Sequence, residues 1–257
     1  MEERKLIEIE YYDKEAKIPQ KSKKETGSLS GFNIFSLESY QFLKDFLRKE
    51  YQNKKVLDYG CGTGTHFSWL SKIYREVIGI DLSKSSIKKS KELIKKEKLH
   101  NVKVLIGDCE KMKFSKKSFD LVFDGGTFSS LYLESALKEI HRVLKPNGIL
   151  IGIETLGHNP LTNLKRRINK ISGKRTAWAT SHIFMIEDLE KIKKYFEIVE
   201  LRFFHLVSWI SFPFLNLPGG KLLLKILEKL DHILLVIFPF FKKYSFKIVF
   251  VLEVKNK

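Results

Sequence analysis

The 257-residue sequence predicts an α/β protein built on a doubly wound, mostly parallel sheet. Between about residues 54 and 155, short apolar runs that suit buried strands alternate with helical stretches. The first run ends at Asp58 and leads into three alternating glycines, and the second run ends at Asp81. Glycines at a tight strand-to-helix turn let the backbone approach a ligand, and an acid that ends the next strand suits ribose hydroxyls. These observations predict a nucleoside-bearing cofactor at the carboxyl ends of the strands.

Residues 1–35 precede the predicted core and are polar and rich in lysine. We expect them to form a loosely ordered lead-in that is anchored by Tyr11 and Tyr12. A helix is predicted to open at Ser36, because the apolar residues after it recur at helical spacing. The residues that should face inward are Phe42, Leu43, Phe46 and Leu47.

The turn after Asp58 departs from two common phosphate-binding motifs. A dinucleotide site requires G-x-G-x-x-G, but the third glycine is Gly64 and Thr65 stands where that pattern needs glycine. A P-loop requires lysine followed by serine or threonine after its last glycine, whereas Thr65 and His66 follow here. The loop therefore fits neither motif.

Three further apolar runs continue the alternation. They end at Asp108, at Asp124 and, after an Asn147-Gly148 turn that suits positive φ, at about residue 155. Parallel strands present their carboxyl ends at one edge of a sheet. We therefore expect the glycine loop, Asp81, Asp108 and Asp124 to lie beside one ligand.

The D-x-G-x-G-x-G pattern and the strand endings after it resemble the class I S-adenosylmethionine-dependent methyltransferases, type 11-like, over residues 33–155. The resemblance implies a Rossmann-like, seven-stranded sheet, with S-adenosyl-L-methionine as cofactor. It implies one domain over residues 1–257, with a cofactor-binding core at 36–155 and with residues 1–35 folded over the cofactor. It also implies that Asp108 faces the adenine amine. The residues expected to bind the cofactor are Asp58, Gly60, Cys61, Gly62, Asp81, Leu82, Asp108, Cys109 and Asp124.

Residues 156–185 begin at the same edge of the predicted sheet, so we expect them to cap the acceptor pocket. The segment carries Arg166, Arg167 and Arg175 in a chain whose basic residues are mostly lysine. Arginine recognises phosphate or carboxylate through paired N–H groups, which favours an anionic acceptor. A solvated helix face is the alternative interpretation.

Glu154 and His158 lie just beyond the fifth predicted strand and are the candidates for catalysis. Methyl transfer from a sulfonium mainly requires that donor and acceptor be held in line, and a general base helps when the acceptor is a hydroxyl. No H-E-x-x-H or paired C-x-x-C spacing is present in the sequence, so no metal is predicted.

The last third of the chain contains an apolar insertion, residues 208–244, between strands predicted over 196–207 and 245–254. A helix over 187–196 precedes the first of these strands. Within the insertion, a helical run from 221 to 238 places apolar residues on one face and charged residues on the other. Its apolar stretch is too short to cross a bilayer. Three interpretations stay open: contact with a membrane surface or a lipid-like acceptor, packing on the chain's own sheet, and oligomerisation.

A formal charge of +17 favours anionic partners such as nucleic acid, anionic lipid or phosphorylated substrates, although a lysine-rich surface composition explains it equally well. Nucleic acid is disfavoured, because Asp124-Gly125-Gly126-Thr127 lacks the N-P-P-Y-type ending of enzymes that methylate base amines. No apolar core follows the first five residues, so no signal peptide is expected. The two cysteines indicate no disulfide framework, which suits a reducing cytoplasm.

The sequence therefore predicts a cytoplasmic methyltransferase that acts on a small anionic or lipid-linked acceptor. A position peripheral to the inner face of the membrane goes with the first of the three interpretations of residues 208–244. Oxygen is the favoured atom. Glycolipid, polysaccharide-precursor and quinone-like acceptors all fit. An RNA methyltransferase and a non-catalytic cofactor-binding module are the alternatives, and no oligomeric state is predicted.

Overall fold

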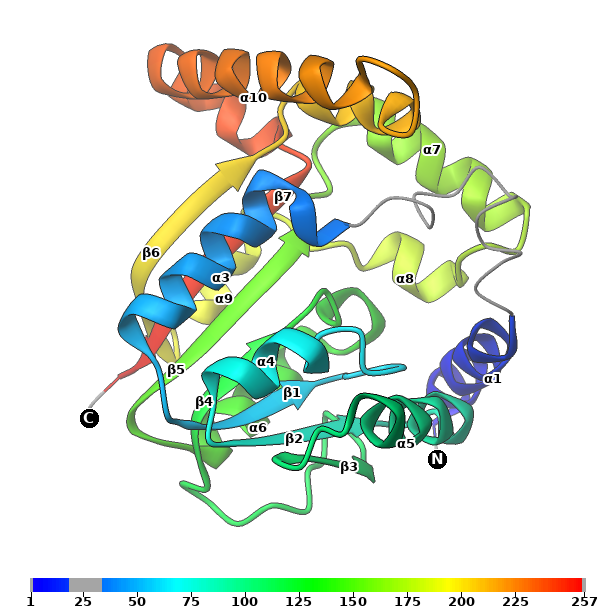
Figure 1. Cartoon of the computed structure of the whole chain (residues 1–257), viewed down its shortest axis with the longest axis vertical. Coiled ribbons are helices and arrows are strands. Elements are labelled where there is room, and N and C mark those ends of the chain that lie inside the picture. Colours follow the sequence, from blue (N-terminus) through cyan, green and yellow to red (C-terminus); the bar gives the residue numbers. More distant parts are fainter. Residues whose placement is uncertain (1, 19–33, 256–257) are drawn as a thin grey trace.

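The computed structural model describes residues 2–18 and 34–255, which form a seven-stranded sheet with helices on both faces (Figure 1). The strands are β1 (Lys55–Tyr59), β2 (Glu76–Asp81), β3 (Val102–Ile106), β4 (Phe119–Asp124), β5 (Leu144–Thr155), β6 (Phe196–Phe204) and β7 (Lys247–Val254). They lie in the order β3-β2-β1-β4-β5-β7-β6. Strands β1 to β5 are parallel, and β7 runs antiparallel between β5 and β6. The predicted mostly parallel, Rossmann-like sheet is confirmed.

The strand order reverses between β1 and β4. The chain passes from β1 outward to β2 and β3, and then returns to the other side of β1 for β4 and β5. In sheets of this kind, connections that diverge at the reversal leave a crevice beyond the carboxyl ends of the strands. The last residues of β1 and β4, Tyr59 and Asp124, are paired, so the loops that follow both strands meet there.

Helices bury one face each against the sheet. The helices on one face are α3 (Glu38–Glu50), α4 (Phe67–Ile73) and α5 (Lys84–Glu97), and those on the other are α6 (Leu133–Val143) and α9 (Asp188–Ile192). Leu43 and Leu47 of α3 are fully buried as predicted. In α6, the buried residues recur at helical spacing and are Ala136, Leu137, Ile140 and Val143.

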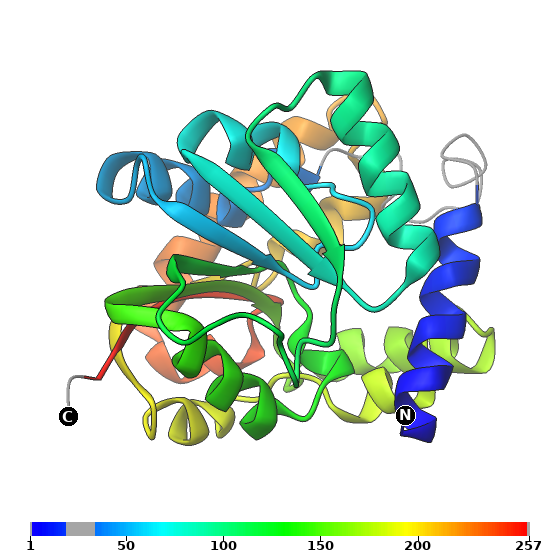
Figure 2. The ribbon, with the colours of Figure 1, turned by 90° about the horizontal axis from the view of Figure 1, so that it is seen from below.

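The lead-in differs from the prediction, because residues 3–17 form a helix, α1 (Glu3–Lys17), that packs beside α5 (Figures 1 and 2). This helix buries the polar side chains of Lys5 and Glu8 instead of an apolar stripe. The apolar periodicity that reveals a helix in a sequence is therefore missing. The part of the predicted lead-in at residues 19–33 lies outside the described residues.

Both predicted anchors of the lead-in make hydrogen bonds to distant parts of the chain. The hydroxyl of Tyr11 donates to the carbonyl oxygen of Lys174 at 2.7 Å. The hydroxyl of Tyr12 lies 3.1 Å from Oγ of Ser130. Helix α1 is thus tied both to the segment after β5 and to the loop after β4.

Strand β6 ends at Phe204, three residues before its predicted end. The next residue, His205, has a φ of +62°, a left-handed conformation through which a strand cannot continue. Its buried ring nitrogens lie 3.0 Å from the hydroxyls of Ser39 and Ser208, which holds the chain in this bend. The other boundaries also shrink: α9 covers only part of the helix predicted over 187–196, and β7 begins at Lys247.

The chain after β5 forms the helices α7 (Pro160–Ile171) and α8 (Ala177–Ser181). The insertion forms two 3-10 helices, η4 (Ser208–Phe214) and η5 (Pro239–Tyr244), on either side of the long helix α10 (Gly220–Ile237). Asp231 of α10 accepts from the N–H of Val207 at 2.7 Å, just before η4. Leu224 and Leu235 are buried, but most other apolar side chains of α10 are exposed. Among residues 2–18 and 34–255, no helix combines the length and hydrophobicity that a bilayer-crossing segment requires.

Gly152 of β5 lies opposite Phe250 of β7 in the middle of the sheet. A Cβ at Gly152 would be 2.2 Å from Cζ of Phe250, whose ring in turn stacks on Phe128. We therefore expect Gly152→Ala to lower the free energy of unfolding by about 1–3 kcal/mol, measured by urea denaturation. Adding Phe250→Leu should recover part of the loss. A Gly152→Ala protein as stable as the wild type would contradict this packing.

Candidate functional site

The loop between β1 and α4 carries the predicted glycine pattern. Gly60 has a φ of +69°, and a Cβ there would be 2.4 Å from the side chain of Thr127. The N–H of Gly62 donates to Oδ2 of Asp81 at 3.0 Å, and Oδ1 of Asp81 accepts from the N–H of Ser83 at 2.8 Å. The carboxylate that ends β2 therefore holds together the loop after β1 and the start of α5.

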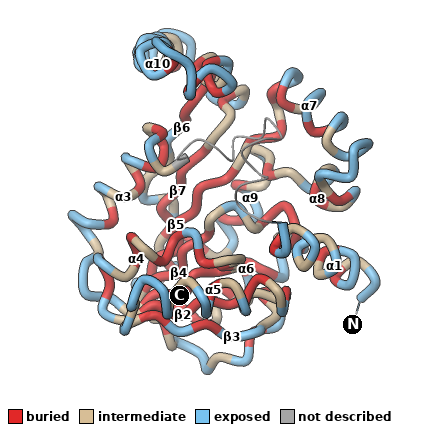
Figure 3. The backbone as a smooth tube through the Cα atoms, turned by 45° about the vertical axis from the view of Figure 1, so that its right-hand side comes forward, coloured by how far each residue is buried: buried red, intermediate tan, exposed pale blue. Residues whose placement is uncertain are grey.

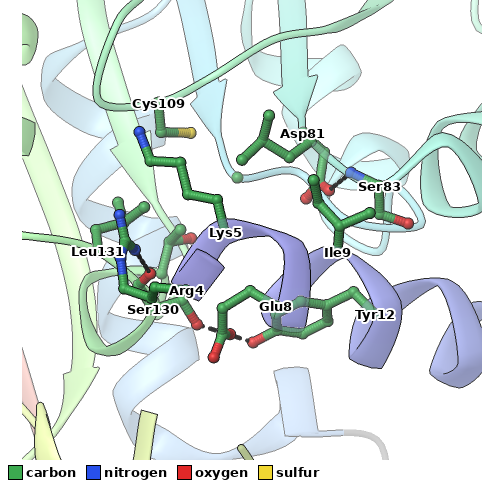
Figure 4. Close-up of a pocket in the computed structure, with 13 residues that line it drawn as sticks. Arg4, Lys5, Glu8, Ile9, Tyr12, Asp81, Ser83, Cys109, Ser130 and Leu131 are labelled. Carbon is green, nitrogen blue, oxygen red and sulfur yellow. Dashed lines mark hydrogen bonds between the residues drawn. The ribbon is translucent and has the colours of Figure 1, made fainter. Parts of the chain in front are cut away.

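Two adjoining hollows open at this edge of the sheet. The first lies between α1 and the loops that follow β2, β3 and β4 (Figure 4). The second has a volume of about 340 Å³ and extends along the glycine loop toward the turn after β4. The residues that line both hollows are Tyr12, Gly60, Asp81, Thr127 and Ser130. Together the hollows form the crevice that the strand order predicts.

Most of the predicted cofactor residues line this crevice. Those that line one or both hollows are Gly60, Cys61, Gly62, Asp81, Leu82 and Cys109. The other three, Asp58, Asp108 and Asp124, are acids that lie close to the crevice without lining either hollow. Both cysteines are buried free thiols.

Helix α1 forms one wall of the first hollow with charged side chains that the sequence analysis did not single out. Nζ of Lys5 lies 2.7 Å from both Oδ2 of Asp108 and Oε2 of Glu110, and Nη2 of Arg4 also lies 2.7 Å from Glu110. Figure 4 shows Lys5 extending from α1 toward Cys109. The carboxylate that was expected to face adenine thus faces an ammonium group of the chain itself.

Asp124 and Glu154 form a buried carboxyl pair at the ends of β4 and β5. Oδ1 of Asp124 accepts from the N–H of Thr127 at 2.9 Å, and Oε1 of Glu154 accepts from the N–H of Phe128 at 2.8 Å. Oδ2 of Asp124 has no hydrogen-bond partner among the described residues. Burial raises the pKa of both groups. The pair therefore fixes the turn after β4, and Glu154 lines neither hollow.

The structure does not bring His158 into the crevice. Its Nε2 accepts from the N–H of Ile186 at 3.1 Å and lies 3.2 Å from Oε2 of Glu187. A different histidine, His66, lines the second hollow directly after the glycine loop. The sequence analysis used His66 only to show that the loop is not a P-loop. Its position two residues after Gly64 is the signal that places it at the crevice.

The arginines that favoured an anionic acceptor are largely occupied by the chain itself. Arg166 donates to the carbonyl oxygen of Leu156 at 3.0 Å, and Arg175 donates to that of Ala179 at 3.0 Å. Arg167 is exposed. Through these contacts, Arg166 and Arg175 stabilise the segment after β5. Within the described part of the chain, no three His, Cys, Asp or Glu side chains gather as a metal ion would require.

Asp58 lies buried beneath the glycine loop, and neither of its carboxylate oxygens has a hydrogen-bond partner among the described residues. Burial raises its pKa to about 8. Nδ1 of His66 is 3.9 Å from Oδ2 of Asp58 and also lacks a hydrogen-bond partner within residues 2–18 and 34–255. Buried polar atoms without partners are rare and need an explanation such as a ligand. A cofactor with a cationic amino acid end fits Asp58, because it would give the carboxylate a charged partner.

Asp58 is expected to make stability depend on pH. The carboxyl group binds a proton more tightly in the folded state, with a pKa of about 8, than in the unfolded chain, with a pKa of 3.8. The free energy of unfolding should therefore fall between these pH values, by up to about 1.4 kcal/mol per pH unit. Asp58→Asn keeps the shape but removes this titration. In urea denaturation, the variant should be the more stable protein at pH 8 and match the wild type near pH 4. Equal pH slopes would argue against the assignment.

Known proteins resemble this chain in both sequence and fold. A family model described as a methyltransferase domain matches residues 50–200. A demethylmenaquinone methyltransferase of Staphylococcus saprophyticus is 32% identical over 187 residues, which cover 64% of this chain and 78% of the relative. Another, from Staphylococcus haemolyticus, is 30% identical over 188 residues, which cover 64% and 77%.

Two solved structures show the same fold at low identity. Phosphoethanolamine N-methyltransferase 2 of Haemonchus contortus, in complex with S-adenosyl-L-methionine, gives a TM-score of 0.63 at 18% identity and covers 93% of this chain and 58% of that chain. Geranyl diphosphate C-methyltransferase of Streptomyces coelicolor gives 0.59 at 13% identity and covers 83% and 78%. The family match spans more than half of this chain and the relatives align over most of their own length. The chain therefore belongs to the methyltransferase-domain family and is a class I S-adenosylmethionine-dependent methyltransferase.

Proposed function

We propose that S-adenosylmethionine lies along the crevice, with its adenosine beneath α1 and its methionine end beside the glycine loop. Asp81 suits the ribose hydroxyls because it lines both hollows, and the unpartnered Asp58 suits the cationic amino group. Asp108 would exchange the ammonium group of Lys5 for the adenine amine. When bound, the cofactor supplies an activated methyl group. The residues of the chain bind and orient both reactants and exclude water.

The role of Asp81 is tested by Asp81→Asn, which keeps the size of the side chain but replaces one acceptor oxygen with a donor. A hydrogen bond to a charged group contributes about 1.5–3 kcal/mol, so the dissociation constant for S-adenosylmethionine should rise by about 10- to 100-fold. Isothermal titration calorimetry measures it. Asp120→Asn is the control, because Asp120 pairs with Lys145 at 2.7 Å and lines neither hollow. Unchanged affinity in Asp81→Asn would contradict the assignment.

We propose further that the acceptor is a lipid-linked molecule that carries an aromatic or quinol hydroxyl. The observation that carries this proposal is an exposed apolar surface on α7, α10 and η5, here called the apolar rim. Its residues are Leu161, Leu164, Ile168, Ile171, Leu222, Ile226, Ile233, Val236, Ile237 and Phe240. Contiguous apolar surface on a folded protein marks a site of contact with a partner or a membrane.

The apolar rim adjoins the end of the sheet where the crevice opens. Figures 1 and 3 show α7 and α10 on the same side of the molecule, beyond the end of β5. Nδ2 of Asn159, at the start of α7, donates to the carbonyl oxygen of Tyr244, at the end of η5, at 3.0 Å. The N–H of Leu156 donates to the carbonyl oxygen of Phe246 at 3.2 Å. An acceptor head group that leaves a bilayer at the rim would therefore have a short path to the crevice.

Charge on the same helices favours an anionic bilayer. Exposed lysines on α7, α10 and η5, and in the turn after α7, are Lys165, Lys170, Lys174, Lys221, Lys225, Lys229, Lys242 and Lys243. Apolar side chains bordered by lysines are typical of helices that lie in the membrane interface, where each lysine near an anionic surface adds about 1 kcal/mol. The relatives' name, demethylmenaquinone methyltransferase, supports the same class of acceptor, a quinone on a lipid tail.

The acceptor class is tested with methyl-labelled S-adenosylmethionine and a total cell extract that is afterwards separated into lipid, glycan, RNA and protein. We expect the label in the lipid fraction, and in a reduced demethylmenaquinone added as a probe. Analysis of the product then separates methylation on oxygen, which the sequence favours, from methylation on carbon. Label confined to RNA or protein would overturn the proposal.

Membrane docking is tested with vesicles that contain phosphatidylglycerol. Ile233→Glu combined with Val236→Glu places charges on exposed positions of α10, so the fold should survive while co-sedimentation is lost, because charge is costly in the apolar part of the interface. Val199→Glu is the matched control, because it places the same charge at an exposed apolar position of β6. This variant should still sediment with the vesicles. Cofactor affinity should be unchanged in both. Equal sedimentation of the wild type, the double variant and Val199→Glu would contradict membrane docking. So would a double variant that still binds vesicles but changes from dimer to monomer, because the apolar face of α10 would then be an interface between copies.

A further inference from the structure

We propose that His66 is the general base that removes the hydroxyl proton of the acceptor, and that Asp58 is its positioning residue. This inference rests on the proposed function, because it requires an acceptor with an acidic proton. His66 follows the glycine loop, where the methionine end of the cofactor is proposed to lie, and it lines the second hollow.

Gly125, the first of the two glycines after β4, leaves the space that the ring occupies. A Cβ at Gly125 would be 2.3 Å from Cε1 of His66 and 3.1 Å from each ring nitrogen. Gly126 also lines the second hollow, so this turn and the imidazole border the same space. A larger side chain at position 125 would displace the ring from the place where a methyl acceptor must approach.

Aromatic side chains hold the imidazole in one orientation. The ring centroid of His66 is 4.9 Å from that of Phe123 in an edge-to-face arrangement, and 6.2 Å from that of Trp69. On the other side, Tyr40 stacks nearly parallel at 6.4 Å. A ring that is held by packing needs little reorganisation to accept a proton in line with the hydroxyl.

The charges around His66 suit a base that becomes cationic only during the reaction. Asp58 on β1 is its acidic neighbour, with Oδ2 3.9 Å from Nδ1. The charged or titratable groups that face it from other elements are Lys247 on β7 and Tyr40 on α3. Burial and Lys247 lower the pKa of His66 to about 4, which keeps the ring neutral and able to accept a proton. With the cationic amino group of the cofactor beside it, Asp58 would be ionised and would stabilise the imidazolium once it forms.

The step balances without an external reagent. His66 takes the proton through one ring nitrogen as the O–H bond of the acceptor breaks. The electron pair released, on the oxygen or on the adjacent ring carbon of a quinol, forms the new bond to the methyl carbon. When carbon is methylated, that carbon then loses its own proton to water and the oxygen regains a proton, which restores the aromatic quinol. The C–S bond breaks with its electron pair left on sulfur. One positive charge is thereby lost from the sulfonium and gained by the imidazolium, which then releases its proton to water.

The other candidate bases are less well placed. Both oxygens of Glu154 accept backbone N–H groups, from Phe128 and Thr155, and the carboxyl group is buried. His158 is engaged with Ile186 and borders neither hollow. His66 alone of these three candidates both lines the crevice and has a buried carboxyl group beside it.

The test uses the full chain with His66→Gly, since glycine is tolerated at this position before α4 and leaves a space for added imidazole. We expect kcat to fall by about 10²- to 10³-fold, with the affinity for S-adenosylmethionine unchanged by calorimetry. Added imidazole should restore part of kcat. His100→Gln is the control, because His100 is an exposed histidine that lines neither hollow.

The positioning role of Asp58 is tested by the pH profile of kcat. In the complex, the cationic amino group of the cofactor would keep Asp58 ionised, and this carboxylate favours the imidazolium form of His66. Asp58→Asn should therefore move the acid limb of the profile to lower pH. A variant that only perturbed the fold would lower kcat at every pH without moving the limb. The acid limb of Asp58→Asn at the wild-type position would overturn the positioning role.

Failure of the base and failure of the acceptor class give different results. His66→Gly that labels extract as fast as wild type, or that loses kcat without any imidazole rescue, would overturn the base. Wild type that labels a fraction other than lipid would overturn the acceptor class, and the comparison with His66→Gly is then made on that fraction. Full loss in His158→Gln with a normal rate in His66→Gly would assign the base to the other histidine.

Discussion

The parallel pairing of β1 with β2 on one side and β4 on the other is the constraint on which the site depends. It brings the carboxylate of Asp81 within 3.0 Å of the N–H of Gly62 and sets Asp124 beside Tyr59. No single loop builds the crevice. A slip of one residue in either register would turn the strand-end acids to the opposite face of the sheet, and the glycine loop would lose its partner.

The same edge concentrates charge that is poorly solvated. Asp58 has no partner among the described residues, and the carboxyl groups of Asp124 and Glu154 are both buried. Such groups lower the stability of the free protein, because burial disfavours their ionised forms. In the proposed binding mode, the cationic end of the ligand would offset this penalty at Asp58. Part of the binding free energy would then come from relieving a cost that the free folded protein carries. Strain of this electrostatic kind is common where function and stability compete.

Sequence patterns predicted the parts of the fold that follow from burial and backbone geometry. Apolar runs located the strands, and the glycines and Asp81 located the crevice. Helix α1 was missed because its buried residues, Lys5 and Glu8, are polar, and only the folded chain shows that they meet distant acids and hydroxyls. The end of β6 depends on a side-chain contact between His205 and Ser39, 166 positions apart, which no local pattern records. The position of His66 at the crevice was also missed, because the sequence analysis looked for a base just beyond β5, at Glu154 and His158.

The antiparallel direction of β7 has a practical consequence. Because β7 begins beside the end of β5, its last residue, Val254, lies at the opposite margin of the sheet from the crevice. Helix α1, in contrast, covers the first hollow of the crevice with Lys5 and Arg4. An affinity tag or a surface anchor attached after Val254 would lie away from the crevice. One attached before Glu3 would act directly on the helix that covers the crevice.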